Sequence, residues 1–494
     1  MAVEGGVEER KEFDKAYATR AMLLFAGVAV TVLYVESMLT PALPSIAKQF
    51  DITSAQATLI LSLYLVSGTA LNPIIGKLGD MYGKKRMLMV ILPIYAVMVS
   101  VTGFSPNYAF LVASRTVQGI GEGIFPLAMS MIREEFPREM IPKAQGLISA
   151  MFGIGAMVGI PVGALISNDF GWQTTYHTAI PLVVILTVLV FYYIRESRYR
   201  SRSGVRLDYV GSVVLGSSIA MIVLALSEGS AWGWRSHAIL GLIGTGVALL
   251  VALPFWESRV EEPLLDLTLL LKRNVLVANF AILFANLGLF LAFQSIIFRL
   301  ELAPPTGYGF DILKAGLYLV AILVGMFVTT ILASTQISKI GAKPLMFLGS
   351  ILGALGFLLL STAESPDQLL YFSPVMACGL GLLFVSSQNI LVLSVDPRKM
   401  GLATSMNTVF RSLGSSLGSP IAGTLISTFT TWILLGYSKG SPIFFQEASV
   451  AAFQYGFYIA AACFLAVLGC VAFAVEVLGK NAGKTGPRRM PAME

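Results

Sequence analysis

The sequence has little charge. Asp, Glu, Lys and Arg together make up 13% of its 494 residues, while 56% are hydrophobic. Soluble globular proteins carry roughly a quarter charged residues. Apolar runs of about 20 residues, the length that crosses a bilayer as a helix, recur along the whole chain. This composition excludes a soluble protein and predicts an all-α integral membrane protein.

Cysteine and histidine are scarce. The three cysteines, Cys378, Cys463 and Cys470, all lie in apolar runs and have neither disulfide nor metal-site spacing. The two histidines, His177 and His237, fall near the ends of predicted helices. The sequence therefore predicts no disulfide framework and no metal site.

Motifs for covalent or ATP-driven chemistry are also missing. There is no Gly-x4-Gly-Lys-Ser/Thr loop, no soluble segment long enough to hold an ATPase domain, and no nucleophile–base arrangement. The N-terminus carries charges of both signs and has no signal-peptide cleavage site. We therefore expect no enzyme activity, no cofactor and no nucleic-acid partner.

The hydropathy pattern predicts fourteen transmembrane helices. With a cytoplasmic N-terminus, 27 of the 34 Lys and Arg residues fall in cytoplasmic segments, five fall outside and two lie within spans. Because this bias never reverses along the chain, it supports the number of spans and cytoplasmic positions for both termini. The predicted ranges are 22–43, 55–76, 87–104, 107–132, 143–166, 173–194, 209–228, 237–256, 275–298, 313–335, 344–362, 369–393, 403–430 and 451–476.

The chain repeats itself weakly at an offset of about 260 residues. GIGEGIF (119–125) returns as GLGLLF (379–384), and GALIS (163–167) returns as GTLIS (423–427). Such repeats are typical of secondary transporters, whose substrate site lies between the halves. We predict a six-helix bundle at 1–200, two inserted helices at 201–262 and a second six-helix bundle at 263–494.

The loop between the second and third predicted helices reads GKLGDMYGKKR. It resembles the signature loop of the major facilitator superfamily. Spaced glycines permit a tight turn and close helix approach, and a lone acid among bases accepts charge-assisted hydrogen bonds. The resemblance implies a cytoplasmic latch between the halves in the outward-open state. The latch residues are Gly76, Asp80, Gly83, Lys84, Lys85 and Arg86.

Two further helices carry motifs of this superfamily. The fourth contains SRTVQGIG, which resembles its Arg-x-x-Gln-Gly-x-Gly motif through Arg115 and Gln118. On the fifth, Gly155, Gly159 and Gly163 fall on one face, so another helix can pack closely there. With Pro161, which favours a kink, this stretch resembles the antiporter motif, although Gly159 and Pro161 are separated by one residue. The alternative is a packing face alone.

The thirteenth helix, GLATSMNTVFRSLG, resembles that of the fourteen-span drug/proton antiporter branch through Asn407 and Arg411. The first helix ends in PALPSI, as in that branch. There the acidic residue usually lies one position earlier, where this chain has Val35. Glu36 is therefore displaced by about 100° around the helix.

Glu36 and Glu122 are the only acids deep within predicted spans, and Arg115 has nearly the same depth as Glu36. A carboxylate at bilayer depth costs several kcal/mol unless it is paired, protonated or hydrated. We predict that Glu36, Glu122 and Arg115 form the proton-coupling set. A protonated, hydrogen-bonded Glu36 or a static Glu36–Arg115 pair remains the structural alternative.

The leading hypothesis is a proton-coupled exporter of amphipathic or cationic small molecules in the plasma membrane, acting as a monomer. A proton-coupled importer or a lipid-headgroup flippase is the second, and a ligand-sensing receptor is the third. Partners would be the substrate, protons and the bilayer. The predicted cavity residues are Tyr34, Gln118, Gln294, Gln388, Asn389, Asn407 and Arg411.

Overall fold

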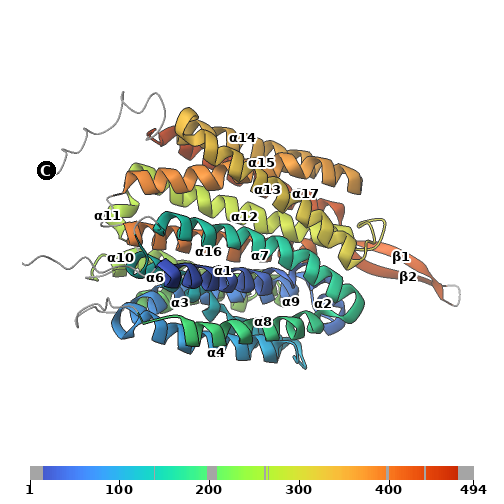
Figure 1. Cartoon of the computed structure of the whole chain (residues 1–494). Coiled ribbons are helices and arrows are strands. Elements are labelled where there is room, and N and C mark those ends of the chain that lie inside the picture. The colour runs from blue at the N-terminus through green and yellow to red at the C-terminus, as the bar shows by residue number, and fades with distance from the viewer. Residues whose placement is uncertain are drawn as a thin grey trace, which may run out of the picture.

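The computed structural model describes residues 15–137, 140–196, 208–260, 263–264, 266–395, 400–438 and 441–476. Its long helices run roughly side by side, and one β-hairpin projects from one end, here called the hairpin end (Figure 1). The elements up to α8 are α1 (Lys15–Ser37), η1 (Thr40–Ala42), α2 (Leu43–Phe50), α3 (Ser54–Tyr82), α4 (Lys84–Thr102), α5 (Tyr108–Gln118), η2 (Gly119–Gly123), α6 (Ile124–Glu135), α7 (Ile141–Phe170) and α8 (Trp172–Tyr193).

Two helices and a short one follow before the second half. The remaining elements are α9 (Tyr209–Trp232), α10 (His237–Glu257), α11 (Leu267–Leu270), α12 (Arg273–Glu301), α13 (Ile312–Ile340), α14 (Ala342–Ser361), α15 (Pro366–Ser394), α16 (Met400–Thr428), β1 (Thr430–Ser438), β2 (Ser441–Ala448) and α17 (Val450–Phe473). We call α1–α8 the N-terminal bundle and α12–α17 the C-terminal bundle.

The helical membrane fold is confirmed. Among the described residues, eleven helical segments are long and apolar enough to cross a membrane. Helices occupy all of the predicted ranges, but two of these ranges are interrupted. The first helix stops at Ser37 and resumes through η1 and α2, because Pro41 and Pro44 lack the N–H that a continuous helix requires. The fourth is broken by the 3₁₀ segment η2.

The antiparallel hairpin β1–β2 is absent from the sequence prediction, which places only a loop after residue 430. Its strands are rich in β-branched and aromatic residues and flank a Gly- and Ser-containing turn, a pattern that favours a hairpin. Trp432 and Phe445 are largely exposed. The segment is too short and too polar at its centre to form another span.

The predicted packing face on the fifth helix is confirmed, and its partner is α1. A Cβ at Gly155 would lie 2.6 Å from the Leu33 Cβ, and one at Gly159 would lie 2.8 Å from the Tyr34 carbonyl oxygen. At Gly163 a Cβ would overlap the backbone of Met38. These three glycines let α7 press against the stretch of α1 that carries Glu36.

The C-terminal bundle repeats this contact. Gly414 and Gly418 of α16 lie against the carbonyl oxygens of Leu283 and Leu287 on α12. Helices α12 and α16 are the repeat partners of α1 and α7. The sequence repeat therefore corresponds to an equivalent helix pair in each bundle.

The two bundles meet through the pairs α3–α16 and α7–α13. Gly423 of α16 lies against Thr58 and Ala55 of α3, and Gly316 of α13 lies against Ala164 of α7. All of these residues are near the hairpin end. Helix α9 packs against both α3 and α16, so the inserted pair α9–α10 borders the contact between the bundles.

We expect Gly163→Ala to destabilise the protein by about 1–3 kcal/mol, because the new methyl group overlaps the carbonyl of Met38, the residue that follows α1. Thermal unfolding of the purified protein measures the change. The matched control is Gly469→Ala on α17, where a Cβ meets no atom within 4 Å. Equal stability of the two variants would contradict the close α1–α7 contact.

Candidate functional site

The two deep acids come together inside the N-terminal bundle. Glu36 lies one residue before the end of α1, and Glu122 lies in η2. Their carboxyl groups are within hydrogen-bonding reach of each other. Glu122 is buried and Glu36 is partly exposed. Because an ionised carboxylate only accepts hydrogen bonds, a bond between the two requires at least one proton on the pair.

Local backbone geometry positions Glu122. Gly119, the first residue of η2, lies so close to α3 that a Cβ would overlap Ser67 Oγ and the Tyr64 carbonyl oxygen. Gly68 of α3 leaves room for the Glu122 side chain, whose Cγ would lie 2.6 Å from a Cβ at that position. The Tyr64 hydroxyl is 3.3 Å from Glu122 Oε1. Tyr64 thus contacts Glu122 directly, which the sequence did not reveal.

Arg115 lies beside Glu36, as its depth predicted, but in a different role. Its guanidinium donates to the carbonyl oxygens of Val35 at 3.5 Å and Glu36 at 3.4 Å. It also donates to the side-chain oxygen of Gln118 and lies 4.6 Å from the centre of the Tyr64 ring. Among the described residues Arg115 makes no ion pair with Glu36 within 4 Å.

Arg115 therefore secures the backbone at the end of α1 rather than neutralising the carboxylate by direct contact. The 3₁₀ segment η2, which turns by about 120° per residue instead of 100°, lies between Arg115 and Glu122. Both side chains contact Tyr64 of α3.

A positive charge reaches the carboxyl pair from the other bundle. Arg411 of α16 interacts electrostatically with both Glu36 and Glu122. The sequence prediction placed Arg411 with the cavity residues and assigned the coupling charges to the N-terminal half alone. The structure instead gives one Arg of the C-terminal bundle an electrostatic interaction with both acids.

The predicted cavity residues occupy different environments. Asn407 donates to Asn279 Oδ1 at 3.0 Å between α16 and α12. Gln294 is fully buried, and neither atom of its amide has a partner among the described residues. Asn389 bonds to its own helix through the Val385 carbonyl at 2.9 Å.

The remaining predicted cavity residues have other surroundings. Tyr34 is buried against the Gly159 face of α7. Gln118 is fully buried and is bound by Arg115, while Gln388 is exposed on α15. The structure thus links Gln118 to Arg115 and Arg411 electrostatically to the two acids, and leaves Gln388 apart from them.

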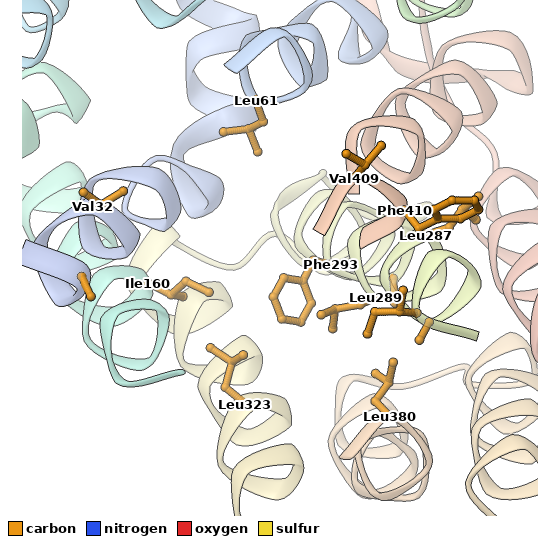
Figure 2. Close-up of a cluster of buried hydrophobic side chains, with 14 of the residues drawn as sticks. Val32, Leu61, Ile160, Leu287, Leu289, Phe293, Leu323, Leu380, Val409 and Phe410 are labelled. Carbon is orange, nitrogen blue, oxygen red and sulfur yellow. The ribbon is translucent and has the colours of Figure 1, made fainter. Parts of the chain in front are cut away.

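The space between the bundles is lined with apolar side chains. Figure 2 shows Ile160 of α7 on the side that faces Leu323 of α13 and Phe293 of α12, whereas Val32 of α1 points away from them. A narrow cavity of about 10 Å³ within the N-terminal bundle reaches Glu122 along α1 and α6 and is otherwise lined mainly by apolar residues. This volume holds about one water molecule.

The predicted latch residues gather at the end of the molecule opposite the hairpin. Lys84 is almost fully buried, and its Nζ lies 2.7 Å from both Asp80 Oδ1 and Glu134 Oε1. Gly83 has φ of 111°, which favours glycine. Gly76 faces open space, so close packing does not explain it.

The backbone N–H groups of the next two latch residues are capped by an acid that the sequence reasoning missed. Lys85 and Arg86 donate to the two carboxylate oxygens of Glu196 at 3.0 and 3.2 Å. Glu476 binds Ala342 and Lys343 at the start of α14 in the same way. An Arg-Glu or Val-Glu step just after the last helix of each half is the sequence signal for these caps.

We expect Lys84→Met to lower the free energy of unfolding by about 1–3 kcal/mol, because Asp80 and Glu134 lose a shared charge-assisted partner. Thermal unfolding at pH 7 measures it. The neighbouring Lys85→Met is the control, since the Lys85 side chain contacts only the Phe191 ring at 5.9 Å among its described partners. A similar loss in both variants would count against the Lys84 cluster.

Comparison with known proteins agrees with this architecture. The family model of the Major Facilitator Superfamily matches residues 25–419 and 306–492. The chain is 27% identical over 376 residues to the multidrug transporter protein MdtP of Bacillus subtilis. The aligned region covers 75% of this chain and 68% of that protein. It is 25% identical over 412 residues to the tetracenomycin C resistance and export protein of Streptomyces glaucescens, covering 82% and 76%.

Solved structures show the same fold. The human organic anion transporter MFSD10 superimposes with a TM-score of 0.62 at 16% identity and covers 92% of this chain and 99% of that one. Together with the helical bundles, the repeat and the signature loop, these similarities identify the protein as a membrane transporter and not an enzyme. The chain belongs to the Major Facilitator Superfamily.

Proposed function

We propose that this protein exports amphipathic or cationic small molecules in exchange for protons. The observation that carries the proposal is that the Glu36 and Glu122 carboxyl groups are within reach of each other and that Arg411 of the opposite bundle interacts electrostatically with both. Exchange of this kind needs a group that accepts either a proton or a substrate, and that changes the attraction between the bundles when it does so.

The carboxyl pair meets the first requirement. An ionised carboxylate within a largely apolar cavity attracts a cation strongly, because the low dielectric weakens screening. A proton on the pair removes that attraction. A proton and a cationic substrate therefore compete for Glu36 and Glu122, and binding of one favours release of the other.

Arg411 meets the second requirement. When the acids are ionised and no substrate is bound, Arg411 attracts them and draws α16 toward α1 and η2. A proton or a substrate cation weakens this attraction, so occupancy of the site changes the balance between conformations. Arg115 and Tyr64 keep the two acids in position throughout, through the contacts described above.

The membrane potential contributes to the driving force for a neutral substrate, whereas exchange of one proton for one monovalent cation moves no net charge and depends on the pH gradient. One elementary charge that crosses 100 mV gains about 2.3 kcal/mol. For a neutral substrate, one exchanged proton then supports roughly a forty- to fiftyfold concentration gradient.

Several wider features belong to the same proposal. We propose fourteen spans, cytoplasmic termini, the plasma membrane as the location and a monomer as the working unit. The names of relatives such as the B. subtilis multidrug transporter protein MdtP support a broad range of exported compounds. The asymmetric placement of basic residues along the sequence supports the orientation.

We expect purified protein in weakly buffered detergent to release protons when the lipophilic cation tetraphenylphosphonium is added. Glu36→Gln and Glu122→Gln should reduce this release to the background level, because each removes one of the two carboxyl groups that hold the proton. A pH indicator measures the protons released per protein, and equilibrium dialysis measures bound cation.

The control is Glu364→Gln, an exposed acid outside the two bundles' interface. Loss of release only in Glu122→Gln would move the coupling site to η2. Binding with equal proton release in the wild type and both variants would make Glu36 and Glu122 structural and would contradict the proposed exchange.

A further inference from the structure

Three consecutive residues near the end of α9 contact both bundles. Toward the N-terminal bundle, Ser227 Oγ donates to the Ala55 carbonyl oxygen at 3.1 Å. The Gln56 side-chain amide donates to both carboxylate oxygens of Glu228, each at 3.1 Å. Ser227 is fully buried and Glu228 is 8% exposed, so little water competes for these bonds.

Toward the C-terminal bundle, Leu226, the first of these three residues, accepts a hydrogen bond. Thr424 Oγ1 on α16 donates to the Leu226 carbonyl oxygen at 2.7 Å. Gly423, next to Thr424, is the residue through which α16 lies against Thr58 and Ala55 of α3. The α9 segment therefore spans the place where α3 and α16 meet at the hairpin end.

The attachment of α9 is uneven. Three of the four hydrogen bonds lead to α3, and Gly216 of α9 additionally lies against Ala70 of α3, where a Cβ would be 2.6 Å from the alanine Cβ. A single bond, from Thr424, leads to α16. When the bundles separate at this end, the weaker attachment breaks first.

We propose that residues 226–228, the α9 strap, hold the two bundles together at the hairpin end. Opening of this end then requires Thr424 to leave the Leu226 carbonyl, while α9 stays on α3. In transporters with this repeat architecture the bundles rock against each other around the central site. The inserted helices, which have no counterpart in the repeat, thus act as a conformational latch.

This inference stands apart from proton coupling. It depends only on the contacts of α9, so a failure of the Glu36 and Glu122 experiment leaves it untouched. Its competitor is closure by α3–α16 packing alone, with α9 as a passive neighbour. The two differ in what happens when the Thr424 hydroxyl is removed.

The experiment measures how often the hairpin end opens. Thr58→Cys places a thiol where α3 meets α16, at a position with no exposed surface. Cys378, Cys463 and Cys470 are first replaced by alanine. The rate at which a hydrophilic maleimide modifies the new thiol in the purified protein is proportional to the open fraction, and it is compared with and without Thr424→Val.

We expect Thr424→Val to raise the rate about two- to tenfold, the range for loss of one hydrogen bond. The matched control is Thr408→Val on the same helix, because the Thr408 hydroxyl bonds only to its own helix at Thr404 among the described contacts. It should leave the rate unchanged.

A second reporter cysteine detects general destabilisation of the fold. Ser350→Cys, on α14 within the C-terminal bundle and fully buried, should react at the same slow rate in all variants. The double variant Ser227→Ala/Glu228→Ala should speed the Thr58→Cys reaction as Thr424→Val does, because a strap fails when either attachment is lost.

Two results would overturn the inference. One is a Thr424→Val rate equal to that of Thr408→Val. The other is acceleration by the Ser227/Glu228 double variant alone, since α9 would then support α3 without binding the bundles together. A matching rise in both reporters would show unfolding rather than opening, and would equally overturn it.

Discussion

The cost of keeping carboxyl groups away from water is the constraint on which the central site depends. Glu36 and Glu122 can lie within a bundle of apolar helices only if protons, hydrogen bonds or opposite charges compensate for lost hydration. Compensating groups are present: the two carboxyl groups are within reach of each other, the Tyr64 hydroxyl contacts Glu122, and Arg411 interacts electrostatically with both acids. A group held by so many partners is sensitive to the gain or loss of any one of them.

The two bundles pack their helices in equivalent ways but differ in their buried charged residues. Glycines bring α7 onto α1 and α16 onto α12 in equivalent ways, and Glu196 and Glu476 cap equivalent helices. Glu36 and Glu122 both lie in the N-terminal bundle. The other half supplies Arg411 and buried amides such as Asn407, so the interface between equivalent scaffolds joins unlike charges.

In the proposed cycle, the inserted helices connect this chemistry to movement of the two bundles. Attraction between Arg411 and the acids acts near the centre of the interface, and the α9 strap acts at the hairpin end. Arg411 and Thr424, which contribute to these two interactions, both lie on α16, which also packs along α3. A change in charge at the centre therefore acts on α16, the same helix that Thr424 bonds to α9. In this proposal, the number of bonds at the centre and at the hairpin end determines how readily α16 moves.

The sequence by itself determined the helical membrane fold, because runs of about 20 apolar residues admit few other structures in a bilayer. It also determined that Glu36 and Glu122 are the deep acids, that Arg115 lies beside Glu36, and that the fifth helix has a glycine face. Only the tertiary structure decided which side chains meet. Helix depth fixes height in the membrane but not rotation, and the 3₁₀ turn of η2, the stop of α1 before its prolines and the crossing of α16 each change that rotation. The interaction of Arg411 with both acids arises from such long-range packing, which no local pattern records, whereas the hairpin strands β1 and β2 carry residues that favour strands.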